Sequence, residues 1–483
     1  MVEKMNAYAT SLSDHYFTNV IAQGVGRVGS LLASFGVYIV VARIGGTEVF
    51  GQYSYILAFS AVIAVFADFG MTPILAKDIA QVKDSSPEQY WGNYLTLRFI
   101  FNIFTVALAA IAVFFFKKNL FLPLLLCALF MPVASARFFE PVFQVFRRPI
   151  LSSYSSLIYA TVYFVLTLIV ISWTKDVSAI VISFIAANTL YVISAYIFAS
   201  GLLKPDFTIK RDTMAGIVKL AMPLGVSSIF AMINGRIAIF MLGEMSSDYS
   251  IAMYNAAYRF VDIAALMAAF FVSPFIPVLA EKALKDPSSL KDSAVKIMEL
   301  IAILIVPAAV ICPVVSGQVV TFLFGPKFIE SALMLNVLSW MAVIIFYSLF
   351  ASAVTLSIGV VFFAYWTTVF AVILGILLNY LWIPGFGAQG SAYAALVCEL
   401  FLAGSTIFYI VKHIGNVFRL DRWLKIILAN LTLWFLLYGP LKDINLFFRI
   451  GTAVGVYGAM IIIFDLFPRD VWQMLVSYVR RKR

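Results

Sequence analysis

Five arginines lie inside long apolar stretches of the sequence: Arg27, Arg98, Arg137, Arg236 and Arg259. A charged side chain at bilayer depth costs several kcal/mol when it faces lipid, so each should face a wet cavity or a counter-charged partner. Arginine stays protonated, and its planar set of N–H donors matches the oxygens of a phosphate group. These residues therefore predict a site for an anionic head group.

The first apolar stretch carries a narrow polar stripe. Asn19, Gln23, Arg27, Ser30 and Ser34 recur at helical spacing and, at about 100° per residue, fall within a sector of about 80°. The other side chains of this helix are almost all apolar. Such a stripe suits the wall of a water-filled cavity, with Gln23 and Arg27 as candidate ligands. A hydrogen-bonded seam between two helices is the alternative.

A second polar face lies in the stretch 250–280. Asn255, Tyr258, Arg259 and Asp262 follow one another at spacings of three, one and three residues, which places them on one side of a helix. Arg259 and Asp262 can pair across one turn. Two readings stay open: a neutralised structural pair, or a substrate-facing Arg259 held in position by Asp262. We include Asn255 and Arg259 among the candidate binding residues.

Two further arginines are candidates for binding the same ligand. Arg98 shares a helical face with Tyr94 and Asn102, and Arg236 stands two residues after Asn234 in another apolar stretch. The deep charges are therefore mainly cationic, which again favours an anionic substrate.

The remaining deep charges predict other roles. Arg137 and Glu140 are spaced for a pair within one helix, which favours a structural or gating role. Glu399 has no charged neighbour in the sequence and is a possible site of ion coupling. Three scattered cysteines and two histidines offer no metal-ligand spacing, so we expect no metal, no cofactor and no catalytic residue.

The elements that position these residues follow from composition. Of 483 residues, 63% are hydrophobic and 12% are charged, against about 25% charged in soluble domains. A membrane-spanning helix needs about 20 mostly apolar residues. The sequence predicts an all-α polytopic membrane protein of about fourteen spans, at 17–42, 51–73, 91–116, 119–139, 149–172, 177–201, 214–243, 250–280, 295–316, 332–357, 360–382, 387–411, 423–439 and 446–468.

Lysine and arginine are distributed unequally between the two sides of this arrangement. With a cytoplasmic amino terminus, most of the basic residues in the connections lie on the cytoplasmic side, which predicts that both termini are cytoplasmic. Lys117 and Lys118 are the local exception, since they fall together in an outer connection. The net charge of +10 is thus mainly a topology signal. Because the basic residues are scattered among loops, we expect no nucleic-acid partner.

A weak internal repeat suggests how the helices are grouped. Gly45 and Gly243 each lead a short turn that follows an apolar helix and precedes a helix opening with tyrosines. Their separation fits a duplication of six helices plus six, with a pseudo-two-fold axis along the membrane normal. We therefore expect an amino-terminal lobe at 1–205, a second lobe at 206–413, and two additional helices with a basic tail at 414–483.

Several segments in order resemble those of the prokaryotic polysaccharide flippases, a family of the multidrug/oligosaccharidyl-lipid/polysaccharide exporter superfamily. The segments are Ala42 to Ser54, Ala67 to Gly70, Ile74 to Ala80, Pro223 to Gly225, Asn234 to Ile237, Tyr254 to Arg259, Leu323 to Phe328 and Gly385 to Ala392. The resemblance covers nearly the whole chain.

The resemblance implies two six-helix lobes around a central cationic cavity. It also implies movement of polyprenyl-diphosphate-linked oligosaccharide across the cytoplasmic membrane by alternating access, with Arg27, Arg236 and Arg259 at head-group-binding positions. The implied partners are that lipid-linked glycan, membrane lipids, and the polysaccharide polymerase and chain-length machinery.

Other functions remain to be weighed. A drug or cation antiporter of the same superfamily needs a deep acidic residue in the first lobe, but no Asp or Glu lies between Asn19 and Val41. A membrane polymerase or glycosyltransferase needs acid/base or metal-binding carboxylates, commonly on a sizeable hydrophilic loop, and the predicted outer loops are short. A scaffold or receptor gains nothing from buried charges.

Overall fold

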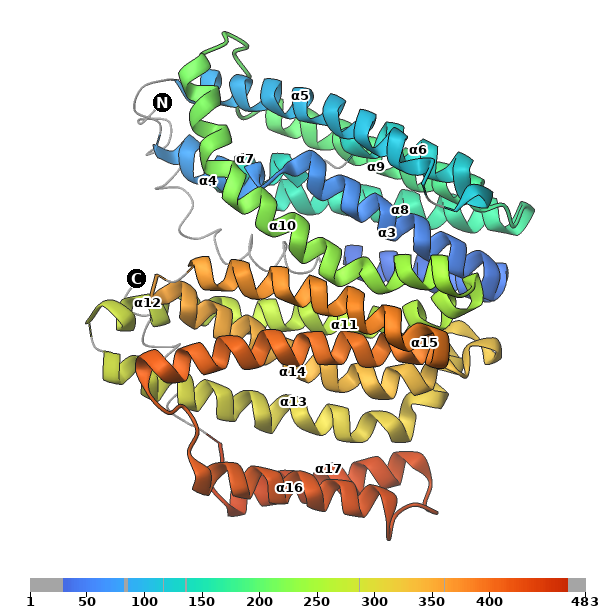
Figure 1. The fold of residues 1–483 in the computed structure, drawn as a ribbon, viewed down its shortest axis with the longest axis vertical. Helices are drawn as coiled ribbons and strands as arrows, with labels where there is room; N and C mark the ends of the chain where they lie inside the picture. Colours follow the sequence, from blue (N-terminus) through green and yellow to red (C-terminus); the bar gives the residue numbers. More distant parts are fainter. Residues whose placement is uncertain are drawn as a thin grey trace. The chain divides into compact units, whose positions relative to one another are not determined.

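A computed structural model describes residues 29–81, 86–115, 117–134, 137–285, 287–359 and 361–467 of the chain. Among these residues every regular element is a helix (Figure 1). The described residues form two compact units that divide the sequence at Met1–Ala252 and Met253–Arg483. The predicted lobe boundaries at 205 and 413 stay a prediction.

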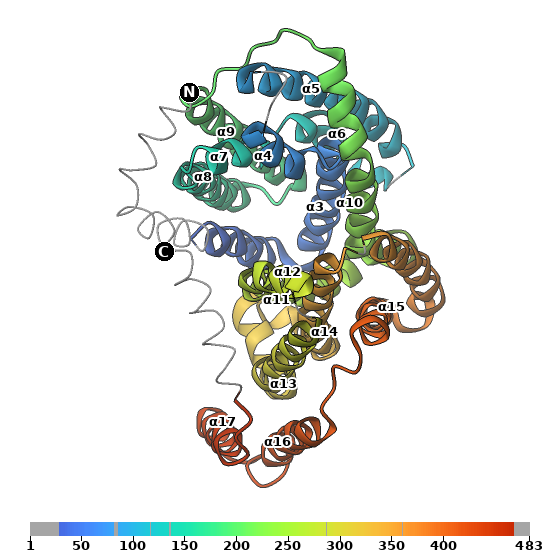
Figure 2. The ribbon, with the colours of Figure 1, turned by 90° about the vertical axis from the view of Figure 1, so that its left-hand side faces the viewer.

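The first unit holds the helices up to the beginning of α11. After a helix at 29–40 come η1 (Val41–Gly45), α3 (Gly46–Asp68), α4 (Met71–Gln81), α5 (Pro87–Val113), η2 (Lys118–Leu120), α6 (Phe121–Ala134), η3 (Arg137–Phe139), α7 (Glu140–Val145), α8 (Ile150–Trp173), α9 (Val177–Ser200) and α10 (Arg211–Met245). Short α4 packs beside short α7 (Figure 2).

The second unit holds most of α11 and everything after it. Its elements are α11 (Asp248–Val272), η4 (Ser273–Phe275), α12 (Ile276–Lys285), α13 (Pro287–Phe324), η5 (Pro326–Phe328), α14 (Ser331–Ser357), α15 (Val361–Ile414), α16 (Leu420–Tyr438) and α17 (Leu446–Ile463). Helices α16 and α17 lie side by side, and the Arg422 guanidinium of α16 lies 3.2 Å from the Glu299 carboxylate of α13. The Tyr457 hydroxyl of α17 donates to the carbonyl of Ile303 in α13 at 2.9 Å.

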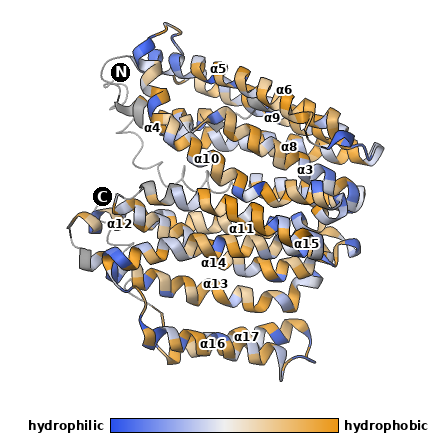
Figure 3. Cartoon of the chain, viewed as in Figure 1, coloured by the Kyte–Doolittle hydropathy of each residue, from blue (hydrophilic) through white to orange (hydrophobic). Residues whose placement is uncertain are grey.

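Ten helices among the described residues are long and apolar enough to cross a membrane. Hydrophobic residues line these helices along most of their length (Figure 3). The prediction of an all-helical polytopic membrane protein is therefore confirmed, whereas the predicted count of fourteen spans is not established by these ten.

The two longest of the ten far exceed the length of one crossing. Gly29–Asp68 has 40 residues and Trp366–Ile414 has 49, or about 60 and 75 Å at 1.5 Å per residue, against a hydrocarbon core of about 30 Å. Each is interrupted at a glycine whose φ is positive: Gly46, with φ 80°, and Gly387, with φ 54°. Only glycine adopts such a conformation readily. Each long stretch therefore consists of two helices joined at a break.

The connection between α9 and α10 is fastened to α5. The Asn93 amide group donates from Nδ2 to the carbonyl of Thr208 at 3.0 Å, and its Oδ1 accepts from the backbone N–H of Lys210 at 2.9 Å. Gly92 permits the close approach, because a Cβ there would lie 1.8 Å from the carbonyl oxygen of Asp206. The segment at the predicted boundary between lobes is thus fixed to a helix of the first unit.

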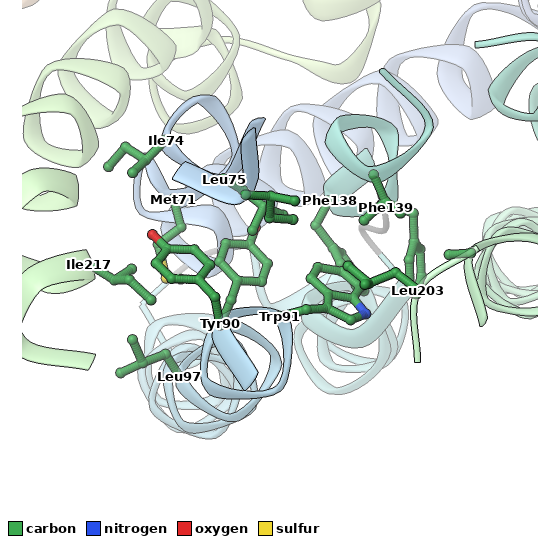
Figure 4. Packing of buried hydrophobic residues seen from close by; sticks show 14 of the residues in the cluster. Met71, Ile74, Leu75, Tyr90, Trp91, Leu97, Phe138, Phe139, Leu203 and Ile217 are labelled. Atoms are coloured by element: carbon green, nitrogen blue, oxygen red, sulfur yellow. The ribbon is translucent and has the colours of Figure 1, made fainter. Parts of the chain in front are cut away.

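An aromatic cluster supports the surroundings of Arg98 in the first unit (Figure 4). The Trp91 ring stacks on Tyr94 at 5.5 Å between centroids and meets the Phe139 ring edge-on at 5.9 Å. Met71 of α4 and Phe138 of η3 belong to the same buried cluster. These contacts pack α4, α5 and η3 against one another.

Candidate functional site

Arg259 is held by two side chains of its own helix, α11. Its Nη2 donates to Oδ1 of Asn255 at 2.7 Å, and its Nη1 lies 2.8 Å from Oδ2 of Asp262. The side chains of Arg259 and Asp262 are 9% and 34% exposed, and Asn255 is fully buried. The predicted pairing across one turn is therefore present. Asn255 and Asp262 fix the direction of the guanidinium group from opposite sides along the helix axis.

The helical spacing explains why this arrangement forms locally. Residues three and four positions apart on a helix are neighbours, so Asn255, Arg259 and Asp262 meet without any long-range contact. Tyr254 and Tyr258 stack at 5.4 Å between ring centroids and are both buried. This stacking packs the beginning of α11. A cation fixed in this way is suited to bind an anion with little loss of side-chain entropy.

Arg98 is placed differently. Its Nη1 lies 2.7 Å from Oδ1 of Asp68 at the end of α3, and its guanidinium carbon lies 4.2 Å from the centroid of the Phe138 ring. The Thr72 hydroxyl donates to the same Asp68 carboxylate. The Arg98 side chain is 3% exposed. The Asp68 carboxylate and the Phe138 ring thus already compensate this charge. A structural role is therefore an alternative to the predicted binding role of Arg98.

Helical spacing within one span does not predict this pair. The two residues are 30 positions apart and lie on different helices, α3 and α5. The available signal was the presence of opposite charges in spans that follow each other directly and therefore pack as neighbours.

The other candidates are distributed over several elements. Arg236 is half-buried in α10, and Glu399 is buried in α15. Arg137 lies in η3 and Glu140 begins α7, so the two do not share one continuous α-helix as the sequence predicted for 119–139. Gln23 and Arg27 lie outside the described residues. Within the second unit the structure thus brings Asn255, Arg259 and Asp262 together.

A polar cluster in the first unit was not predicted. The ammonium group of Lys117 lies 2.5 Å from Oδ1 of Asp248, and Gln52 Nε2 donates to Oδ2 of the same carboxylate at 3.0 Å. Beside it, the Tyr55 hydroxyl donates to Oε1 of Glu244 at 3.1 Å. The signal in the sequence was Lys117 itself, a lysine in a connection predicted to lie on the side where basic residues are few.

The described residues contain no group of three or more His, Cys, Asp or Glu side chains that could hold a metal ion. What they offer chemically includes cations on apolar helices, among them Arg259, whose guanidinium is held by Asn255 and Asp262. A guanidinium group can bind an anion reversibly. It does not by itself supply a nucleophile or a general base.

Comparisons with known proteins agree with this picture. A family described as "Polysaccharide biosynthesis protein" matches residues 17–282. The "Capsular polysaccharide biosynthesis protein CapF" of Staphylococcus aureus is 22% identical over 401 residues, which cover 81% of this chain and 98% of that protein.

Solved structures of transporters share the fold. The structure described as "Lipid II flippase MurJ, inward closed conformation" aligns with a TM-score of 0.73 at 14% identity, covering 93% of this chain and 98% of that one. An inward-facing multidrug resistance MATE family transporter of the MOP superfamily aligns with a TM-score of 0.66 at 13% identity, covering 80% and 94%. At these identities the likeness is one of fold.

Proposed function

Because the chain belongs to the polysaccharide biosynthesis protein family, we propose that it is a flippase for polyprenyl-diphosphate-linked oligosaccharide. In this proposal it moves an O-antigen, capsule or exopolysaccharide repeat unit across the cytoplasmic membrane. It alternates access to a central cationic cavity, and both of its termini are cytoplasmic. Polysaccharide polymerase and chain-length proteins would receive the product.

The observation that carries this proposal is the fixed guanidinium of Arg259 in a membrane-spanning helix. A diphosphate presents several acceptor oxygens that a guanidinium group can bind through two parallel N–H donors. Asn255 and Asp262 orient that group before any substrate arrives. Arg27 and Arg236 would contribute further positive charge. The names of the relatives support a lipid-linked glycan as cargo, since one is a capsular polysaccharide biosynthesis protein and another a lipid II flippase.

The direct test uses a strain that lacks its own polysaccharide flippase. We expect expression of this chain to restore surface polysaccharide, and we expect its loss to leave lipid-linked repeat units on the cytoplasmic leaflet. Surface glycan and lipid-linked intermediates would be measured together, with protein abundance in parallel. Unchanged glycan with altered resistance to cationic drugs would instead support the antiporter, the second candidate within the same fold.

The membrane potential supplies a driving force for this cargo. Moving one charge through 100 mV is worth about 2.3 kcal/mol, so a substrate with two negative charges leaving a negative interior would gain about twice that amount. A co-transported ion is then not required. We therefore expect Glu399→Gln to retain at least about half of the wild-type export, measured as surface glycan per molecule of protein. Complete loss of export at normal abundance would assign ion coupling to Glu399.

A further inference from the structure

Three connections of the first unit meet at one polar cluster. Lys117 precedes η2 and α6, Gln52 lies in the second turn of α3, and Asp248 begins α11 directly after the turn that follows α10. The Lys117–Asp248 ion pair and the Gln52–Asp248 hydrogen bond occupy both oxygens of one carboxylate. The sequence predicts that all three connections lie on the outer side of the membrane. Only connections on the same side can contact one another, so their contact is consistent with that prediction.

The backbone also comes close at this point. A Cβ on Gly51 would lie 1.9 Å from the carbonyl oxygen of Asp248, so only glycine allows α3 to approach the turn between α10 and α11. A Cβ on Gly243 would lie 2.3 Å from the Tyr55 ring. That ring meets Phe240 edge-on at 5.5 Å between centroids. The beginning of α3 is therefore seated against the end of α10.

The chemistry of the contact is unusual for a permanent helix junction. The Lys117 and Asp248 side chains are only 13% and 14% exposed, so both charges have lost most of their hydration. Well-packed apolar side chains join two helices as firmly as a desolvated ion pair, or more firmly. An ion pair has one property that an apolar pair lacks: each charge regains its hydration when water enters, so the contact separates at low cost.

We propose that Lys117, Gln52 and Asp248 form a latch that closes the outer end of the transport path, and that each transport cycle opens it. The inference rests on the proposed function and on the predicted lobe boundary at 205. With that boundary, α3 and α6 belong to one lobe and α10 and α11 to the other, so the lobes separate on the outer side only when this latch opens.

The test follows the accessibility of a cysteine placed just inside the latch. Phe240→Cys would be introduced into a chain in which Cys127, Cys312 and Cys398 are changed to Ala, and intact cells would be treated with a membrane-impermeant maleimide. We expect Lys117→Met to raise the labelling rate of this cysteine roughly fivefold, a factor equivalent to about 1 kcal/mol. Glycan export should fall, because an outer end that rests open is poorly closed when substrate enters from inside.

Lys118→Met is the matched control. Lys118 carries the same charge one residue further along and is exposed, so its loss should leave labelling unchanged. The exchange Lys117→Asp with Asp248→Lys should bring labelling back toward the parent level. An equal rise with Lys118→Met, or no rise with Lys117→Met at unchanged thermal stability, would overturn the latch.

A further variant keeps the result interpretable. If Lys117→Met does not accumulate, Gln52→Ala removes one hydrogen bond without stranding a charge, and it should raise labelling by a smaller factor. Unchanged labelling in that variant would count against the latch. The labelling measurement needs no substrate. If the parent protein with an intact latch exports no glycan, a rise in labelling with Lys117→Met would support the latch while the flippase assignment is refuted.

Discussion

Arg259→Ala should reduce glycan export by roughly 30-fold or more while protein abundance stays near the wild-type level. Truncating one partner of a desolvated, charge-assisted contact costs about 2–5 kcal/mol, and the lower figure already corresponds to that factor. Arg27→Ala should behave in the same way under the proposed function. Arg259→Lys should recover only part of the export, because a point charge replaces a planar pair of donors. Complementation of a flippase-null strain, with abundance measured in parallel, gives both readouts.

A purely structural Arg259 predicts a different pattern. Loss of the guanidinium would then leave the Asp262 carboxylate without its counter-charge, so abundance would fall. The double change Arg259→Ala with Asp262→Ala would restore both abundance and transport. Full export by this double variant would show that Arg259 is a partner of Asp262 and not a ligand of the substrate.

Gly70→Ala should destabilise the protein by about 2–5 kcal/mol, enough to remove most of the folded protein from the membrane. Gly70 follows α3 with φ 70°, and a Cβ there would lie 2.4 Å from the backbone nitrogen of Gly225 in α10. The contact is reciprocal, since a Cβ on Gly225 would lie 2.6 Å from the carbonyl oxygen of Phe69. Backbone atoms cannot move aside as a flexible side chain can, so the helices themselves must separate.

Gly359→Ala separates the two causes of the destabilisation expected for Gly70→Ala, which are the positive φ and the close contact with the backbone of α10. Gly359 has a similar φ of 81°, but a Cβ there would meet nothing within 4 Å. Its replacement should cost only the conformational strain, about 1–2 kcal/mol. Thermal unfolding of the purified proteins in detergent would measure both. Equal losses of stability in the two variants would show that the approach of α3 to α10 contributes nothing.

Hydropathy alone predicted several helices with good boundaries, whereas the expected span 295–316 is shorter than α13 at Pro287–Phe324 by eight residues at each end. The expected span 332–357 is α14 at Ser331–Ser357, and the expected span 177–201 is α9 at Val177–Ser200. Apolar length decides such elements, and length is visible in a sequence. The expected span 119–139 was too long, because α6 ends at Ala134 and a separate 3-10 turn begins at Arg137.

Some contacts of the candidate site could be predicted from the sequence and others could not. The contacts of Arg259 within α11 could be predicted because they depend only on helical spacing. The Asp68–Arg98 and Lys117–Asp248 pairs could not, because they depend on how each helix is rotated about its axis against a neighbour. The partners of Lys117 and Arg98 lie 131 and 30 residues away, distances over which local periodicity carries no information.

The separation of 131 positions between Lys117 and Asp248 also means that the two residues are synthesised at different times. A ribosome adds about 5–20 residues per second, so Lys117 emerges roughly 7 to 26 seconds before the carboxylate that will neutralise it. Throughout that interval Lys117 has no partner in a connection predicted to lie on the sparsely charged side, and α3 has no contact with α10, which is still to be synthesised. The early helices must therefore keep their predicted orientation through their other basic connections until α10 and the beginning of α11 have been synthesised.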